Sequence, residues 1–267
     1  MRELIKRGLS GLLYISVLLF CIFSSENTFL LLFLFLGLVC LSEYLRLISY
    51  RFWHPYLLLI AGLVIFSYYK VNRIATYIYL ALTLLTSLYL IRNLIRLKVR
   101  RLTRSYKLIL TLFYMVGGFV FLTLIPSYQD NFNPEIVAGI FALIWINDSF
   151  AFLVGKSIGK RKLFASVSPK KTIEGFLGGL LFAMLGSYFI VKFTDTLDLT
   201  VWLVLSIIVS CFGTLGDLIE SKFKREAHVK DSGIFLPGHG GLYDRLDSLL
   251  FASPFIYLTL LIAHYVS

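Results

Sequence analysis

The chain has 267 residues, of which 58% are hydrophobic and only 15% are charged, and its formal net charge is +11. Soluble domains carry about 25% charged residues, so this composition excludes an ordinary soluble globular protein. Together with the repeated apolar runs, it predicts a membrane protein that crosses the bilayer several times.

The apolar runs predict the fold class. A spanning helix needs about 20 mostly apolar residues. Nine segments are candidates, centred on residues 8–23, 28–46, 54–69, 74–91, 107–125, 135–155, 173–192, 200–220 and 248–265. We therefore expect an all-α, polytopic bundle of about nine transmembrane helices.

The basic residues predict the orientation. If the N-terminus is cytoplasmic, 23 of the 26 Lys and Arg residues fall on the cytoplasmic side, and only Lys70, Arg73 and Lys192 fall outside. The positive-inside rule predicts such a bias, which one miscounted span would destroy. We therefore expect an integral protein of the plasma (inner) membrane whose basic surface contacts an anionic leaflet and not nucleic acid.

The two halves of the chain differ in their polar content. The first five spans have few internal polar groups, so we expect residues 1–130 to form an N-terminal transmembrane scaffold. Residues 131–267 would then form a C-terminal catalytic region of about four helices with cytoplasmic loops. Carboxylates at membrane depth are costly and normally face a protein interior or a water-filled cavity. Eight of the eleven carboxylates in this second half lie in, or at the edge of, the expected cytoplasmic loops, namely Asp148, Glu174, Asp217, Glu220, Glu226, Asp231, Asp244 and Asp247.

Small residues recur every three or four positions in the sixth, seventh and eighth spans, which is typical of close helix packing. In the sixth span they follow Asp148, and in the eighth they end at Asp217, which packing alone does not explain. The seventh span opens at "SPKKTIEGFLGG", where Ser168 or Thr172 can cap the helix and Pro169 fits its first turn. Three helices thus have close-packing faces and carboxylates on one side of the membrane.

The ninth span begins with Asp244 and Asp247, which are three residues apart and so share one helix face. Gly240 and Gly241, just before them, would let backbone N–H groups approach a phosphate closely. Two such carboxylates beside Asp217 would suit a hard, oxygen-liganded ion such as Mg2+. Carboxylates for a metal and cations for phosphates are what phosphoryl or nucleotidyl transfer requires. The surrounding basic residues are Lys170, Lys171, Lys222, Lys224, Arg225, Lys230 and Arg245.

Each of these features has a simpler explanation when it is taken alone. The sequence "PGHGG" is typical of a turn, His239 of a hydrogen-bonded loop residue, and an Asp-Arg pair of a salt bridge. The density of such features at one membrane face favours a catalytic site.

The stretch from Ser221 to Asp247, "SKFKREAHVKDSGIFLPGHGGLYDRLD", resembles the signature of the phosphatidate cytidylyltransferases (CDP-diacylglycerol synthases). Two upstream blocks, "NDSFAFLVGKSIGK" and "SPKKTIEGFLGG", are also similar to the family, although Phe152 stands where the family usually has Tyr. The close match covers roughly residues 145–250. The chain agrees with the signature at Ser221, Lys224, Arg225, Lys230, Asp231, His239, Gly240, Gly241, Asp244, Arg245 and Asp247.

The resemblance implies that the chain converts CTP and phosphatidic acid into CDP-diacylglycerol and pyrophosphate. It also implies a nine-span helical fold, dependence on Mg2+ and a homodimer, with a second cation left open. We expect Asp217 and Asp244 to ligate the metal, with Asp247 as a third ligand and Asp148 as a weaker candidate.

The remaining signature residues are expected to bind substrate. Lys224, Arg225 and Arg245 would bind either the triphosphate or the lipid phosphate, and Lys170 and Lys171 would bind the other. The further substrate-binding candidates are Ser221, Lys230, Asp231, His239, Gly240 and Gly241.

Three other functions are compatible with parts of the pattern. A CTP-dependent polyprenol or phytol kinase would transfer the γ-phosphoryl group to a lipid alcohol, but the full signature argues against it. A transporter could use the carboxylates as an ion path, although inverted repeats and mid-membrane broken helices would then be expected. A purely structural membrane protein would not need paired carboxylates at helix ends.

Overall fold

The structure, a computed structural model, describes residues 2–96, 103–235 and 240–266, and describes side chains from residue 11 onward. It is nearly all-helical, and seven of its described helices are long and apolar enough to cross a membrane. Two shorter apolar helices, Gly11–Ser24 and His54–Tyr68, coincide with the first and third predicted spans. The membrane helical bundle is confirmed, whereas the count of nine spans and the cytoplasmic N-terminus stay predictions.

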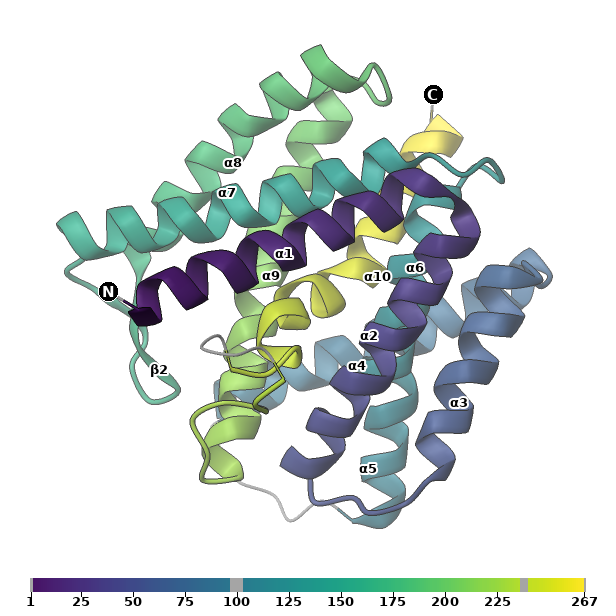
Figure 1. Ribbon diagram of the computed structural model, residues 1–267, viewed down its shortest axis with the longest axis horizontal. Coiled ribbons are helices and arrows are strands. Elements are labelled where there is room, and N and C mark those ends of the chain that lie inside the picture. Colours follow the sequence, from purple (N-terminus) through teal and green to yellow (C-terminus); the bar gives the residue numbers. More distant parts are fainter. Residues whose placement is uncertain (1, 97–102, 236–239, 267) are drawn as a thin grey trace.

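The first half of the chain forms the part of the bundle drawn in purple and blue in Figure 1. The fifth predicted span is one continuous helical segment, Arg104–Ser127, in which π-helical and 3-10 turns interrupt the α-helix. The elements are α1 (Arg2–Ser24), α2 (Glu26–Leu47), α3 (His54–Gly62), the π-helix η1 (Leu63–Tyr68), α4 (Arg73–Arg96), α5 (Arg104–Leu110), the π-helix η2 (Thr111–Val116), α6 (Gly117–Leu124) and the 3-10 turn η3 (Ile125–Ser127).

The second half adds four long helices and one hairpin. The helices are α7 (Pro134–Ile158), α8 (Ile173–Thr194), α9 (Leu199–Glu226) and α10 (Tyr243–Val266). The strands β1 (Lys162–Phe164) and β2 (Ser168–Thr172) pair antiparallel between α7 and α8. An all-α fold was therefore too strict. Pro169 lies in β2 and not in the first turn of a helix, whereas Thr172 does cap α8, as its Oγ1 accepts from the Gly175 N–H at 3.1 Å.

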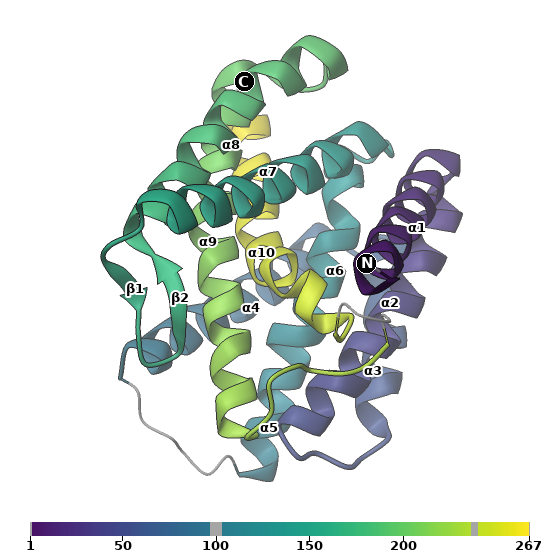
Figure 2. The same ribbon diagram turned by 60° about the vertical axis from the view of Figure 1, so that its left-hand side comes forward.

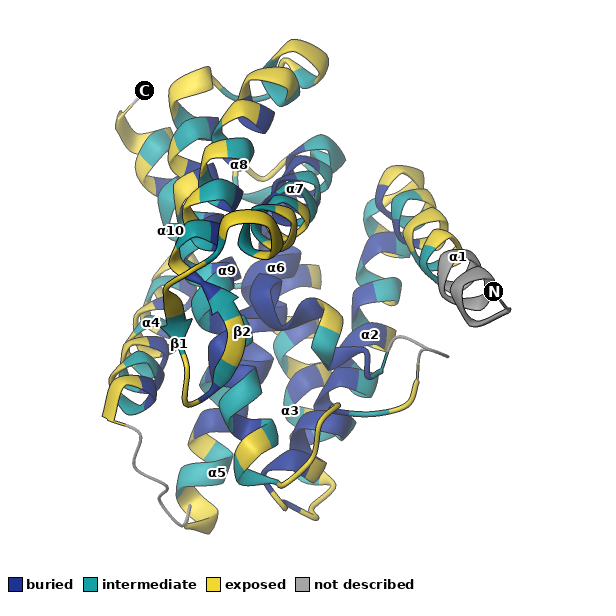
Figure 3. Ribbon diagram, turned by 90° about the vertical axis from the view of Figure 1, so that its left-hand side faces the viewer, coloured by how far each residue is buried: buried dark blue, intermediate teal, exposed yellow. Residues whose placement is uncertain are grey.

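The centre of the bundle is formed by α6 and α10. Every residue of α6 is buried, and Figure 3 shows this helix in dark blue behind more exposed neighbours. The hydroxyls of Tyr114 and Tyr243 lie 2.6 Å apart, and both side chains are fully buried. The start of α10, where the candidate site residues cluster, is thus anchored to the core by packing and by a hydrogen bond.

Small residues bring α7 and α8 together as predicted, and an unpredicted glycine does the same for α9 and α10. A side chain at Gly179 would meet the Asn147 carbonyl oxygen of α7 at 2.7 Å, and one at Gly175 would meet that of Ala151 at 2.7 Å. Between α9 and α10, a side chain at Gly216 would meet the Asp247 carbonyl oxygen, also at 2.7 Å. Close backbone approach therefore fixes α7, which carries Asp148, against α8, and fixes the helices that carry Asp217 and Asp247 against each other.

Substitution of Gly179 by Leu is expected to destabilise the α7–α8 contact. The new side chain would press against the backbone of Asn147, which cannot give way as a flexible side chain could. Overpacking of this kind costs about 1–3 kcal/mol. Thermal unfolding in detergent should report it, with Leu181→Ala on the exposed face of the same helix as the control. Equal stability of Gly179→Leu and wild type would show that α7 and α8 do not pack this closely.

Candidate active site

The candidate residues gather around one cavity of about 910 Å³. Side chains from α1, α7, the hairpin, α8, α9 and α10 line it, so both halves of the chain contribute. Figure 2 shows the hairpin beside α9, where α7 ends. The predicted site residues in its wall are Asp148, Lys170, Lys171, Asp217, Asp244, Arg245 and Asp247.

Asp217 lies on α9 and is held by two neighbours. The Lys171 ammonium is 2.6 Å from Asp217 Oδ2, and the Ser221 hydroxyl donates to Oδ1 over 3.3 Å. Lys171 is held in this position because it lies in β2, directly before Thr172, which caps α8. Ser221 is one helical turn beyond Asp217, so its predicted place beside the site is explained by helix geometry.

Two more carboxylates face the same region. Asp148 accepts a hydrogen bond from the Asn147 amide at 3.2 Å, and Asp247, on α10, is only 6% exposed. Asp148 and Asp217 both lie near enough to Asp247 to interact with it electrostatically, and Lys171 interacts with Asp148 and Asp247. The three carboxylates thus lie close together in a cavity wall that also holds five basic residues, and a bound cation would add to the compensation of their charge.

Asp244 has a different environment from the other carboxylates. The Lys224 ammonium donates to its Oδ1 at 2.8 Å, and the Gly241 and Ser232 N–H groups donate to its Oδ2 at 2.8 Å and 3.0 Å. Lys224 also pairs with Glu220 at 2.6 Å. Gly240 has a φ of 83°, which a residue with a side chain rarely adopts, and this turn brings the Gly241 N–H to Asp244. In this arrangement Asp244 binds backbone N–H groups of the segment between α9 and α10, called here the signature loop (described residues 227–235 and 240–242). The role of Asp244 as a metal ligand stays a prediction.

The other predicted residues lie further from the cavity. Arg225, Lys230 and Asp231 are exposed and do not line it, and Gly241 packs against the Ser232 hydroxyl. His239 lies outside the described residues. The structure thus brings four of the predicted carboxylates together with Lys170, Lys171 and Arg245 in one cavity wall. The binding roles of the predicted residues outside this wall stay predictions.

Several contributors to the site were not among the predicted residues. Glu220, whose side chain is 1% exposed, completes the Lys224 pair, and Lys156 and Lys162 line the cavity. All three belong to stretches that the sequence already marked, because Glu220 follows the small-residue stripe, Lys156 lies in a block similar to the family, and Lys162 was counted for orientation. Glu43, from the presumed scaffold, contacts the signature loop. An isolated acidic residue inside an apolar span was the available signal.

The donor set suits Mg2+, although the protein alone does not form a closed metal cage. Among the residues described, no three His, Cys, Asp or Glu side chains are close enough to enclose a metal ion. Magnesium is commonly bound by one or two carboxylates together with substrate phosphates. Asp217 and Asp247, with Asp148 nearby, offer such oxygens, and the ammonium of Lys171 shows that a positive charge is accommodated there.

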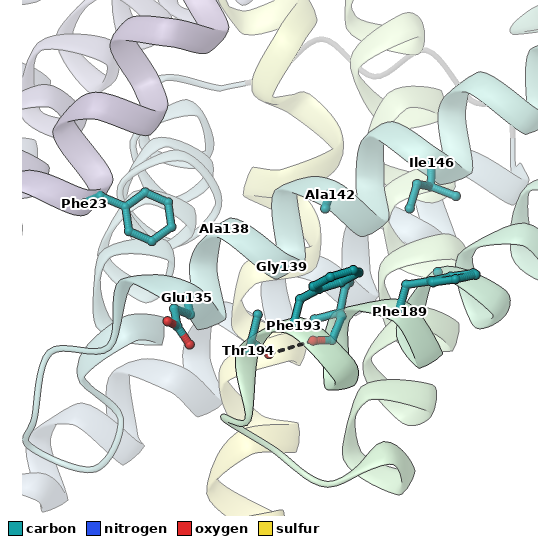
Figure 4. Close-up of a pocket in the computed structure, with 11 residues that line it drawn as sticks. Phe23, Glu135, Ala138, Gly139, Ala142, Ile146, Phe189, Phe193 and Thr194 are labelled. Carbon is teal, nitrogen blue, oxygen red and sulfur yellow. Dashed lines mark hydrogen bonds between the residues drawn. The ribbon is translucent and has the colours of Figure 1, made fainter.

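A second cavity, of about 560 Å³, has a different character. It lies between α1, α7 and α8 and is lined almost entirely by apolar side chains such as Phe23, Ile146 and Phe189, with Glu135 at one end (Figure 4). None of the predicted site residues lines it. The cavity that contains the carboxylates is therefore the one with the groups that phosphate chemistry needs.

Comparison with known proteins gives consistent matches. Residues 5–263 match the model of the cytidylyltransferase family. A phosphatidate cytidylyltransferase of Bacillus subtilis (strain 168) is 34% identical over 97% of this chain and 98% of its own length. The phosphatidate cytidylyltransferases of Staphylococcus haemolyticus (strain JCSC1435) and Staphylococcus aureus (strain COL) are 42% and 47% identical over 54% and 45% of this chain. These two alignments span about half of each relative, 55% and 47% of its length.

Proposed function

The chain belongs to the cytidylyltransferase family, and from this membership we propose that it transfers the cytidylyl group of CTP to phosphatidic acid. The products are CDP-diacylglycerol and pyrophosphate. The observation that carries the proposal is the match to a phosphatidate cytidylyltransferase over 97% of the chain, because that alignment includes the whole cavity that contains the carboxylates.

The reaction needs no nucleophile from the protein. A phosphate oxygen of phosphatidic acid forms a bond to the α-phosphorus of CTP, and the bond from that phosphorus to the α–β bridging oxygen breaks. Pyrophosphate leaves with the electron pair of the broken bond. The work of the site is then to hold two polyanions in line and to neutralise their charge.

The cavity wall supplies groups for this work. Lys170, Lys171 and Arg245 would neutralise the phosphates, together with Lys156 and Lys162 at the cavity wall. When bound at Asp217 and Asp247, Mg2+ would supply further charge neutralisation. The substrate phosphates and Asp217 would compete for the Lys171 ammonium, so Lys171 would move from Asp217 to a phosphate when the substrates bind.

The setting of the reaction is also part of the proposal. We place the enzyme in the plasma membrane, with nine spans, a cytoplasmic N-terminus and the cavity open to the cytoplasm, because 23 of the 26 basic residues then face the anionic leaflet. CTP would enter from the cytoplasm and phosphatidic acid from the bilayer. A homodimer is expected from the resemblance to the family.

The choice of acceptor tests the proposal against its rivals. Purified protein with CTP and Mg2+ should release pyrophosphate when phosphatidic acid is supplied, but not with diacylglycerol, which lacks the attacking phosphate. Release of CDP with a polyprenol acceptor would identify a kinase instead. If no acceptor gives turnover in folded protein with several divalent cations, the transporter becomes the better interpretation.

Tyr14 offers a finer prediction about lipid binding. Its hydroxyl is buried without a hydrogen-bond partner in the described part of the chain, and Tyr14 lines the cavity from α1. One hydrogen bond to the lipid phosphate or ester is worth about 0.5–1.5 kcal/mol, so Tyr14→Phe should raise the KM for phosphatidic acid roughly 3- to 10-fold with kcat unchanged. Tyr77→Phe removes a hydroxyl from an exposed tyrosine pair and is the control. An unchanged KM in Tyr14→Phe would remove this hydroxyl from the binding site.

A further inference from the structure

Glu43 is a buried carboxylate in a helix that otherwise looks like scaffold. It lies near the end of α2, is 3% exposed, and has the buried residues Cys40 and Tyr44 as neighbours on its helix. Burial of a carboxylate is costly unless its oxygens are hydrogen-bonded. A residue of this kind in an apolar span needs a structural or functional reason.

The reason is a set of contacts with the signature loop. Glu43 Oε2 accepts hydrogen bonds from the Tyr243 N–H at 2.8 Å and the Ser232 hydroxyl at 3.1 Å. Tyr243 is the first residue of α10, and the N–H groups of the first helical turn have no partner within the helix. Glu43 therefore caps α10 from another helix, and its negative charge lies at the positive end of the α10 dipole.

The loop is shaped to receive this carboxylate. A side chain on Gly241 would lie 2.6 Å from Glu43 Oε2, and one on Gly233 would collide with Oε1. Gly241 belongs to the signature, and the sequence alone favoured a phosphate-binding role for it. Its lack of a side chain also makes room for Glu43 and for the Ser232 hydroxyl.

The contacts continue from Glu43 to the Asp244–Lys224 pair. Ser232 donates its hydroxyl to Glu43 and its N–H to Asp244 Oδ2 at 3.0 Å, while Tyr243 directly precedes Asp244 in the chain. Asp244 in turn binds Lys224. Glu43 does not line the cavity itself, so any influence on the reaction passes through Ser232 and the start of α10.

We propose that Glu43 is a positioning residue, which fixes the signature loop and the start of α10 so that Asp244, paired with Lys224, keeps its place at the cavity. The proposal rests on the proposed cytidylyl transfer. It assigns part of the active-site geometry to the N-terminal half of the chain.

The test compares three substitutions in the full-length protein in lipid nanodiscs. Glu43→Ala removes both contacts, Glu43→Asp shortens the side chain, and Glu43→Gln keeps one oxygen able to accept both hydrogen bonds. A displacement of about 1 Å in a catalytic group can reduce the rate by about 100-fold. We expect kcat to fall roughly 10- to 100-fold in the Ala and Asp variants, with less than about 3-fold change in the KM for CTP, and we expect partial recovery in the Gln variant.

A double-mutant cycle separates positioning from general stabilisation. If Glu43 acts through Ser232, then Ser232→Ala lowers kcat in the wild-type background and has almost no further effect in Glu43→Ala. Additive effects of the two changes would overturn the proposal, and so would wild-type kcat in Glu43→Ala. The proposal would also be overturned if, in all three Glu43 variants, kcat fell only in proportion to the amount of folded protein. Should Glu43→Ala not fold, the same cycle is run with Glu43→Asp, whose shorter side chain also withdraws from Ser232.

The matched control is Glu26→Gln, at the other end of α2. Glu26 pairs with Lys70 at 3.2 Å and is partly exposed, so its loss should leave kcat unchanged. Failure of the proposed function is recognised separately, because the wild-type protein would then not form CDP-diacylglycerol at all. Failure of the positioning proposal leaves wild-type activity intact.

Discussion

Asp217→Asn is expected to reduce kcat by about 100-fold or more, while the protein stays folded. The substitution keeps the shape of the side chain and removes its negative charge. Asp217 faces the cavity beside Lys171 and near Asp247, where the proposed reaction would hold a cation and the substrate phosphates together. Loss of this charge would remove the proposed metal ligand and would leave Lys171 without its partner on α9.

The same experiment has a matched control on the same helix. Asp198 precedes α9 at its opposite end, where its side chain makes no capping hydrogen bond, so Asp198→Asn should retain wild-type kcat. Steady-state assays with CTP and phosphatidic acid, together with thermal unfolding curves, separate catalysis from folding. Near-normal kcat in Asp217→Asn would show that this carboxylate does not take part in the reaction.

Lys224→Met is expected to cause the largest loss of stability. Lys224 is the cation between Glu220 and Asp244, whose side chains are 1% and 9% exposed. Removing one partner of a buried ion pair costs about 3–5 kcal/mol, because the remaining charge is left unpaired. Here two carboxylates would be left together, so activity should be lost along with stability.

Two further variants test this explanation of Lys224. A second substitution, Glu220→Gln, removes one of the two unpaired charges and should restore part of the stability of Lys224→Met. Lys222→Met, two residues earlier on α9, breaks a 3.9 Å pair with Glu226 and a hydrogen bond to the Asn93 carbonyl, and should cost about 1 kcal/mol. Denaturant titration in mixed micelles measures all of these variants. A Lys224→Met protein as stable as wild type would contradict the paired geometry.

The helices and their close-packed faces could be predicted because each follows from a local pattern. Apolar length gave the spans, and small residues at intervals of four gave the contacts at Gly175 and Gly179, whereas Gly216, which makes the close contact with α10, lay outside the predicted stripe. The hairpin was missed because its strands have only three and five residues and carry no clear alternation of apolar and polar side chains. Pro169 therefore looked like a helix start and is a strand residue.

The site residues could be named from the sequence more easily than their partners could. The spacing of Asp244 and Asp247 places them on one helix face, but it does not reveal that Asp244 binds Lys224 and the loop while Asp247 lies near Asp148 and Asp217. Contacts between distant segments are the least predictable. Glu43 is 189 and 200 residues from Ser232 and Tyr243, and no local pattern connects them.

The most direct test of the account follows the phosphorus atoms of CTP. Purified protein would receive phosphatidic acid, Mg2+ and CTP labelled separately at the α and γ phosphates. The account predicts that the α label enters the lipid and the γ label appears in pyrophosphate. Entry of the γ label into the lipid, with release of CDP, would contradict cytidylyl transfer and assign the cavity that contains the carboxylates to a kinase.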